Sequence, residues 1–286
     1  MYRVQRYDGA VVHWRIDHPD RLTLDGEVRS LDVFLISGRL NVVGTDGPAR
    51  IEIATIGRKP LLVAHDGGRL VVRHEEPRRW PGVFWWLFRQ AGRYRTDVSV
   101  AVPRDTDASL RVVSGSLVVS ALTGAVDADA TSGRITMLGL SGRSTAKAIS
   151  GSIEALGISG DLNLETVSGE ITLGDASAQR LRARAVSGAI TCDLDNRPGS
   201  EIRLETTSGE ITVRVREDSD LDVSLHAMSG RLTSAFAELP TTGGHGANRT
   251  VAGRLGAGTG RLVASAISGN ISLLRRAVEP DESAAA

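Results

Sequence analysis

Ser-Gly pairs recur along this sequence, and their spacing limits the fold more than any other feature. From Ser114 to Ser168 a Ser-Gly or Thr-Gly pair occurs every nine residues, with Thr123 filling the one gap. The later serines follow at steps of 19, 21, 21 and 39 residues, ending at Ser268. Because two steps of nine nearly equal one later step, we interpret the repeat as a coil of about 18–21 residues with a Ser-Gly corner.

The residues around each corner alternate in a way that predicts strands. The third residue after the serine is apolar in ten of the eleven pairs, and only Ser144 breaks this rule. The alternation of apolar residues also changes phase at the glycine, as it does between Leu204 and Ile211. A period of two predicts half-buried strands, and a phase change at glycine predicts a bend that residues with a Cβ avoid. We therefore predict an all-β, single-domain β-solenoid in which each coil lies on the previous one.

The same glycine spacing also fits hairpin turns of an antiparallel sandwich, so that alternative stays open. Residues 1–104 alternate less regularly, and we interpret them as N-terminal strands with an aromatic insertion at residues 78–95. Residues 105–276 carry the regular solenoid repeats. Residues 277–286 are polar and small, which predicts a disordered tail.

The corner sequences "TSGRI", "ISGSI", "VSGEI", "TSGEI" and "ISGNI" carry a family resemblance. They resemble the Ser-Gly-Asp-Ile-type β-strand repeats of a bacterial family of unknown function, often labelled candidate adhesins, whose fold is similar to a toast rack. The resemblance covers roughly residues 20 to 276. It implies a β-solenoid with a single sheet on each side, and it carries no known catalytic residues.

Composition and charge narrow the partners and the compartment. With 34 basic and 34 acidic residues the formal net charge is zero, so we expect no nucleic-acid partner. The one cysteine, Cys192, has the inward parity of Ile190 and Leu194, which predicts a buried small hydrophobe and suits a reducing compartment. The N-terminus lacks the apolar core of a signal peptide, and no segment approaches the ~20 apolar residues of a membrane span. We therefore expect a cytoplasmic protein.

Two acid pairs are the only candidates for chemistry. Asp127 with Asp129, and Asp193 with Asp195, each share one strand face, a spacing that suits metal binding or acid–base catalysis. Their alternation with apolar residues instead indicates outward, solvated charges. The six histidines are scattered without a zinc-binding pattern, and the Gly-rich segment 253–262 lacks the Gly-Lys-Ser/Thr ending of a phosphate loop. We predict no enzyme, no metal and no cofactor.

The stretch "RRWPGVFWWLFRQAGRYR", residues 78–95, holds six of the eleven aromatic residues. Trp85 and Trp86 are adjacent, so they cannot both point into one small core. Tryptophan flanked by arginine is typical of lipid headgroup boundaries and of protein hot spots, and a bulky segment also suits a lid over the end of a solenoid. The candidate interaction residues are Arg78, Arg79, Trp80, Phe84, Trp85, Trp86, Phe88 and Arg89.

These observations leave two main hypotheses for function. The first is a non-enzymatic scaffold, adhesin-like, that binds an unknown protein partner or copies of itself. The second is a membrane-peripheral protein attached through residues 78–95. A carbohydrate-active β-helix is a third, more remote hypothesis, and it depends on the two acid pairs.

Overall fold

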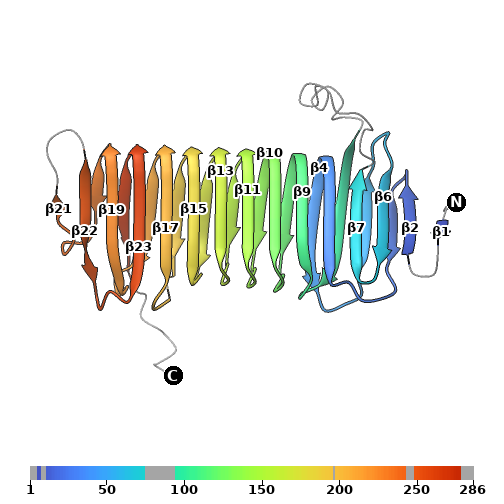
Figure 1. Ribbon diagram of the computed structural model, residues 1–286, viewed down its shortest axis with the longest axis horizontal. Coiled ribbons are helices and arrows are strands. Elements are labelled where there is room, and N and C mark those ends of the chain that lie inside the picture. The colour runs from blue at the N-terminus through green and yellow to red at the C-terminus, as the bar shows by residue number, and fades with distance from the viewer. Residues whose placement is uncertain (1–4, 8–10, 75–93, 196, 243–247, 278–286) are drawn as a thin grey trace. The chain divides into compact units, whose positions relative to one another are not determined.

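The computed structural model describes most of the chain, in five stretches: residues 5–7, 11–74, 94–195, 197–242 and 248–277. The described residues form 24 strands and no helix (Figure 1). The predicted all-β solenoid is therefore confirmed. The chain divides into two compact units, residues 1–154 (unit 1) and residues 155–286 (unit 2).

Each unit is a stack of short strands. The strands of unit 1 are β1 (Gln5–Tyr7), β2 (Val11–Ile16), β3 (Asp20–Thr23), β4 (Ser30–Thr45), β5 (Arg50–Thr55), β6 (Leu61–Asp66), β7 (Arg69–His74), β8 (Arg95–Pro103), β9 (Asp107–Ser120), β10 (Val126–Leu138) and β11 (Ser144–Ser150). The strand at the boundary is β12 (Ile153–Leu156). The strands of unit 2 are β13 (Leu162–Ser168), β14 (Ile171–Ala176), β15 (Arg180–Ser187), β16 (Ile190–Leu194), β17 (Glu201–Ser208), β18 (Ile211–Arg216), β19 (Leu221–Ser229), β20 (Leu232–Ser234), β21 (Thr241–Thr242), β22 (Arg249–Leu255), β23 (Gly260–Ser268) and β24 (Ile271–Arg276).

Unit 2 consists mainly of coils in which two strands meet at a Ser-Gly corner. The strands before the corner form one parallel ladder, in which Ser187 of β15 lies opposite Ser208 of β17. The strands after the corner form a second parallel ladder, in which Ile190 of β16 lies opposite Ile211 of β18. Because every coil keeps the same register, equivalent side chains of successive coils lie in rows.

The coils of unit 2 do not stack in sequence order. We predicted that each coil lies on the previous one, and this is wrong for the last coil. Strand β23 pairs with β17 on one edge and with β19 on the other, so Ser268 lies between Ser208 and Ser229. The remaining edge of β19 pairs antiparallel with β22, which in turn pairs with β21. Because β22 occupies that outer edge, the last parallel strand inserts between β17 and β19.

The interior consists of the apolar residues that the corner rule predicts. The ten residues three positions after a corner serine are all buried: Leu40, Leu117, Ile135, Ile153, Leu162, Ile171, Ile190, Ile211, Leu232 and Ile271. The exception, Ser144, is also buried, and it lies opposite Val126 of β10. Its Oγ donates a hydrogen bond to the Gly142 carbonyl at 3.3 Å, which satisfies the buried hydroxyl.

The corner glycines are required by the close approach of neighbouring coils. A Cβ added to Gly209 would lie 2.0 Å from the carbonyl oxygen of Gly188, and one added to Gly269 would lie 1.7 Å from that of Gly209. Gly209 also has a φ of +155°, and Gly169 has the same value, as the sequence predicted. Glycine is therefore needed at these corners for two reasons: the backbone has a positive φ, and neighbouring coils leave no space for a Cβ.

Unit 1 joins a regular part to an irregular part. Strands β4, β9, β10 and β11 pair in parallel, and Ser114 lies opposite both Ser37 and Ser132. In the N-terminal part, β2 pairs antiparallel with β6, β6 with β7, β3 with β5, and β5 with β8. Strand β4 in addition pairs in parallel with β7 and with β8.

Cys192 is buried, and burial raises the pKa of its thiol, as expected for an inert interior cysteine. Among the described residues, there is no helix long and apolar enough to cross a membrane. The predicted division into residues 1–104, 105–276 and 277–286 stays a prediction.

Candidate binding surfaces

The aromatic-basic stretch lies mostly outside the described residues. Residues 75–93 are not described, so the eight candidate interaction residues from Arg78 to Arg89 stay predictions. The last aromatic residue of the stretch, Tyr94, is described and is buried at 3% exposure. Its ring meets the ring of His74 edge-on, with centroids 5.6 Å apart. At least this aromatic belongs to the interior of unit 1.

His74 is a fully buried, hydrogen-bonded histidine. The backbone N–H of Ile36 donates to its Nδ1 at 3.1 Å, so the proton of the neutral ring is on Nε2. Nε2 lies 3.0 Å from Thr96 Oγ1, and that hydroxyl donates to the Tyr94 carbonyl. Burial lowers the pKa of His74 to about 4. The histidine is therefore a structural link between β7 and its neighbours.

The acid pair at the end of β16 is neutralised by arginines. Asp193 accepts hydrogen bonds from Arg214 and from Arg276, and Asp195 lies 3.3 Å from Arg276 and 3.5 Å from Arg216. The hydrogen bond from Arg214 lowers the pKa of Asp193 below its usual range. A carboxylate held ionised in this way is a poor general acid.

The acid pair on β10 also lies among ordinary surface charges. Asp129 is in register with Lys147 of β11 and with Arg111 of β9, and Asp127 is in register with Ser109 and Thr145. Throughout the described residues, no group of three or more His, Cys, Asp or Glu side chains could hold a metal ion.

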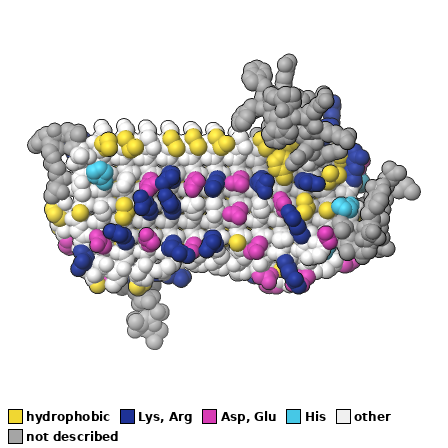
Figure 2. All heavy atoms as spheres, viewed as in Figure 1, with side chains coloured by type: hydrophobic (Ala, Val, Ile, Leu, Met, Phe, Trp, Pro, Cys, Tyr) yellow, Lys and Arg dark blue, Asp and Glu magenta, His cyan; other side chains and the backbone are white. Residues whose placement is uncertain are grey.

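The outer face of unit 2 carries a row of alternating charges. Six strands lie side by side on this face in the order β13, β15, β17, β23, β19 and β22. The charged row has one outward residue at each strand, in the order Asp161 (directly before β13), Arg180, Glu201, Arg261, Asp222 and Arg254. Acidic and basic side chains alternate along this face in Figure 2.

Most members of the charged row form no direct ion pair among the described residues, although the charge of Glu201 acts on the neighbouring Arg180. Arg180 donates to Asp161, and this hydrogen bond raises the pKa of Arg180. For the four other members, no ion pair occurs within the stretches that the structure describes. Their charges are therefore available to a partner.

An exposed apolar row runs along the corner edge of the same face. It consists of the residues just before the corner serines, in stacking order Val167, Val186, Thr207, Ile267 and Met228. The four hydrophobic members are between 45% and 52% exposed. Figure 2 shows hydrophobic side chains along this upper edge. With strands about 4.8 Å apart, the row is about 19 Å long.

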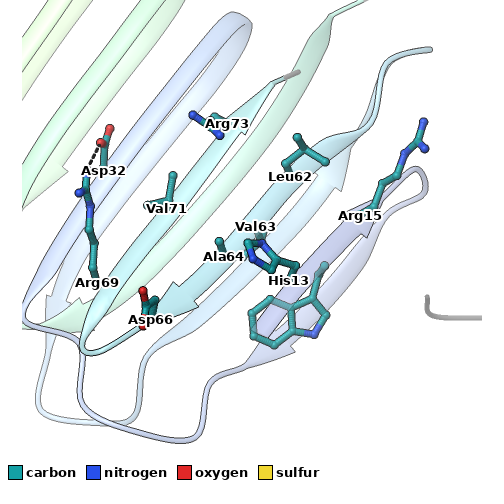
Figure 3. A pocket seen from close by; sticks show the side chains of 11 residues that line it. His13, Arg15, Asp32, Leu62, Val63, Ala64, Asp66, Arg69, Val71 and Arg73 are labelled. Atoms are coloured by element: carbon teal, nitrogen blue, oxygen red, sulfur yellow. Dashed lines mark hydrogen bonds and ion pairs between the residues drawn. The ribbon is translucent and has the colours of Figure 1, made fainter. Parts of the chain in front are cut away.

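Unit 1 has a different feature, an open hollow of about 580 Å³ on the outer face of β2, β6, β7 and β4 (Figure 3). Its floor consists of the half-buried residues Leu62, Ala64 and Val71. Arg15 and Arg73 lie on either side of Leu62, because both are in register with it. The charged and polar rim residues are His13, Arg15, Asp32, Asp66, Arg69 and Arg73.

Sequence reasoning missed both the hollow and the apolar row. The row had a signal, because Val, Ile, Met or Thr precedes most corner serines just where the alternation changes phase. The hollow had none, because its strands come from an irregular part of the sequence, and their pairing cannot be inferred from a repeat.

Comparison with other proteins identifies the family. No protein with a curated function matches the sequence. Among solved structures, a candidate cell adhesion protein from Clostridium sporogenes is 10% identical, with a TM-score of 0.26, and the match covers 90% of this chain and 100% of that chain. A candidate adhesin from Bacteroides fragilis is 11% identical, with a TM-score of 0.45 and coverage of 92% and 97%. One from Parabacteroides distasonis is 12% identical, with a TM-score of 0.30 and coverage of 94% and 98%.

These scores are too low to support an argument about function. The sequence pattern of the family described as Toastrack DUF4097, in contrast, matches residues 43–274, which is most of the chain. The predicted resemblance is thereby confirmed. The chain belongs to the Toastrack DUF4097 family.

Proposed function

We propose that this protein is a non-enzymatic, adhesin-like scaffold that pairs face to face with a second copy of itself through the outer face of unit 2. The observation that carries the proposal is the charged row from Asp161 to Arg254, because its alternating pattern is self-complementary. A rigid β-solenoid holds such a row at fixed spacing, so little conformational entropy is lost on binding.

The complementarity follows from two-fold symmetry. A two-fold axis parallel to the strands, between β17 and β23, places each row of one copy over the same row of the other, in reverse order. Glu201 then faces Arg261 of the second copy, Arg180 faces Asp222, and Asp161 faces Arg254. All six contacts join opposite charges.

The other rows of the face tolerate the same arrangement. Glu205 would face Ser265, Arg203 would face Val263, and Arg184 would face His226, so no like charges meet as long as the histidine is neutral. Along the apolar row, Val186 would face Met228. Apolar contact supplies affinity, and charge complementarity supplies register and specificity.

The non-enzymatic part of the proposal is supported by the acid pairs. Asp193 and Asp195 are engaged by arginines, and the comparisons lend no support to carbohydrate cleavage. A cytoplasmic location, and a peripheral membrane contact through residues 78–95, stay predictions from the sequence.

Charge exchange at the centre of the face tests the proposal by sedimentation equilibrium. We expect the wild-type protein to have twice the 30.3 kDa chain mass. Glu201→Arg alone and Arg261→Glu alone should each be monomeric, because each places like charges opposite one another. An equimolar mixture of the two variants should restore the dimer, and so should the double variant, because both recreate opposite pairs.

Two further variants complete the experiment. Ile267→Glu should abolish the dimer through the apolar row, whereas Glu210→Arg, exposed but outside the face, should leave the mass unchanged. Circular dichroism verifies that each variant is folded. A monomeric wild-type protein, or single variants that dimerise like the wild type, would overturn the proposed pairing.

A further inference from the structure

Two arginines at the hollow of unit 1 have no direct ion-pair or hydrogen-bond partner among the described residues. Arg15 and Arg73 are exposed, and neither forms an ion pair or a hydrogen bond among the residues that the structure describes. The third rim arginine differs, because Arg69 donates to Asp32 at 2.9 Å. Among the described residues, the hollow therefore has one arginine in an ion pair and two without one, and the charge of Arg15 also acts on the nearby Asp17.

The strand register fixes where the two unmatched charges lie. Arg15 on β2 and Arg73 on β7 are both neighbours of Leu62 on the intervening strand β6. With strands about 4.8 Å apart, their Cα atoms are about 10 Å apart, and both side chains are on the same outer face. Figure 3 shows Arg15 and Arg73 on either side of Leu62, with their guanidinium groups pointing apart. Arginine side chains are long enough to turn onto one group bound above Leu62.

The adjacent part of the floor is apolar. The next row along the strands holds Ala64 and Val71 in register, both half-buried on the same face. The exposed carboxylate of Asp66 lies one row further, opposite Arg69. The hollow thus changes from positive at the Arg15 and Arg73 end, through apolar, to a mixed end with Asp66. A volume of about 580 Å³ is within the range of small-molecule sites.

We propose that this hollow binds a small amphipathic oxyanion. The anionic group, a carboxylate, sulfonate, sulfate or phosphate ester, is held between Arg15 and Arg73, whose planar guanidinium groups match oxyanions in a bidentate manner. The apolar body of the ligand lies over Leu62, Ala64 and Val71. Asp66 excludes a second negative charge from the opposite end, which favours a ligand with one anionic head. The site is in unit 1 and does not depend on the pairing proposed for unit 2.

A matched pair of fluorescent probes tests the proposal on the full chain. The probe 8-anilinonaphthalene-1-sulfonate has an apolar body and one anionic head, and N-phenyl-1-naphthylamine has the same body without the sulfonate. We expect the wild-type protein to bind the sulfonate at least tenfold more tightly than the uncharged probe. The double variant Arg15→Gln, Arg73→Gln should lose this preference, with unchanged affinity for the uncharged probe.

Control variants separate the site from general surface binding. The variant Arg50→Gln, Arg143→Gln removes two exposed arginines elsewhere in unit 1 and should bind both probes like the wild type. Ala64→Phe, which fills the floor of the hollow, should weaken both probes. Melting curves monitored by circular dichroism verify that the variants are folded.

Displacement experiments identify which part of the ligand matters. Dodecanoate should displace the bound sulfonate, whereas inorganic phosphate at the same concentration should not, because it has no apolar body. Displacement by phosphate as effective as that by dodecanoate would overturn the amphipathic part of the proposal. Equal sulfonate affinity in the wild type and the Arg15→Gln, Arg73→Gln variant would overturn the site itself.

Discussion

Unit 2 and the N-terminal part of unit 1 are both built from strands, yet their outer faces differ. In unit 2, in-register parallel strands repeat one pattern, so each outward position becomes a row, as with Glu201 and Arg261. In the N-terminal part of unit 1, antiparallel strands of unlike sequence lie side by side, so unlike residues such as Arg15 and Leu62 converge. Repetition produces extended faces suited to another protein surface, and its interruption produces a local hollow suited to a small ligand.

The interior row of unit 2 is where a substitution should have the largest effect. Ile171 is completely buried and in register with Ile190. Ile171→Asp places an unpaired charge between apolar neighbours, and we expect the free energy of unfolding to fall by more than about 4 kcal/mol. Urea denaturation measures this change.

The neighbouring residue provides the control for that substitution. Thr172 points outward on the same strand, opposite Thr191, so Thr172→Asp should change the stability by no more than about 0.5 kcal/mol. Similar losses for the two variants would show that the inward and outward faces of β14 are not as different as the register requires.

Glycine substitutions should cause the next largest loss of stability, and the loss should differ between the two regions. Gly209→Ala would bring a Cβ to 2.0 Å from the backbone oxygen of Gly188 in the preceding coil, and we expect the free energy of unfolding to fall by about 3 kcal/mol. Gly67, in the β6–β7 turn, has a φ of +52° and nothing within 4 Å, so Gly67→Ala should cost only the conformational term of about 1 kcal/mol.

Denaturant midpoints of the two glycine variants compare these costs directly. Ser208→Ala, beside Gly209 and exposed, should shift the stability by less than about 0.5 kcal/mol. Equal losses at Gly209 and Gly67 would mean that the corner glycines serve backbone conformation alone, and that the close coil contact has no energetic consequence.

The same contrast explains how much the sequence could predict. The corner rule identified ten buried positions correctly, because a repeated pattern constrains every coil at once. The stacking order of Ser229 and Ser268 was wrong, because both corners have the same local sequence pattern and only the edge pairing of β19 with β22 separates them. The hollow could not be predicted from the sequence. Its contacts among His13, Ala64 and Val71 depend on strand pairings that no sequence repeat indicates.

Protonation of His74 should have a smaller effect than the substitutions at Ile171 and Gly209, and one confined to unit 1. Its pKa is about 4 in the folded chain, because burial disfavours the charged ring, against an ordinary value near 6.5. Below pH 6.5 the unfolded chain therefore binds a proton that the folded chain does not, so stability falls as the pH drops towards 4 and this contribution is constant outside that window. Between pH 7.5 and pH 5 we expect His74 to lower the free energy of unfolding by about 2 kcal/mol.

The variant His74→Gln should lack this part of the pH dependence, whereas His18→Gln, at an exposed site, should keep it. Urea denaturation at the two pH values measures the difference, and parallel losses in the wild type and His74→Gln would contradict the structural role of this histidine.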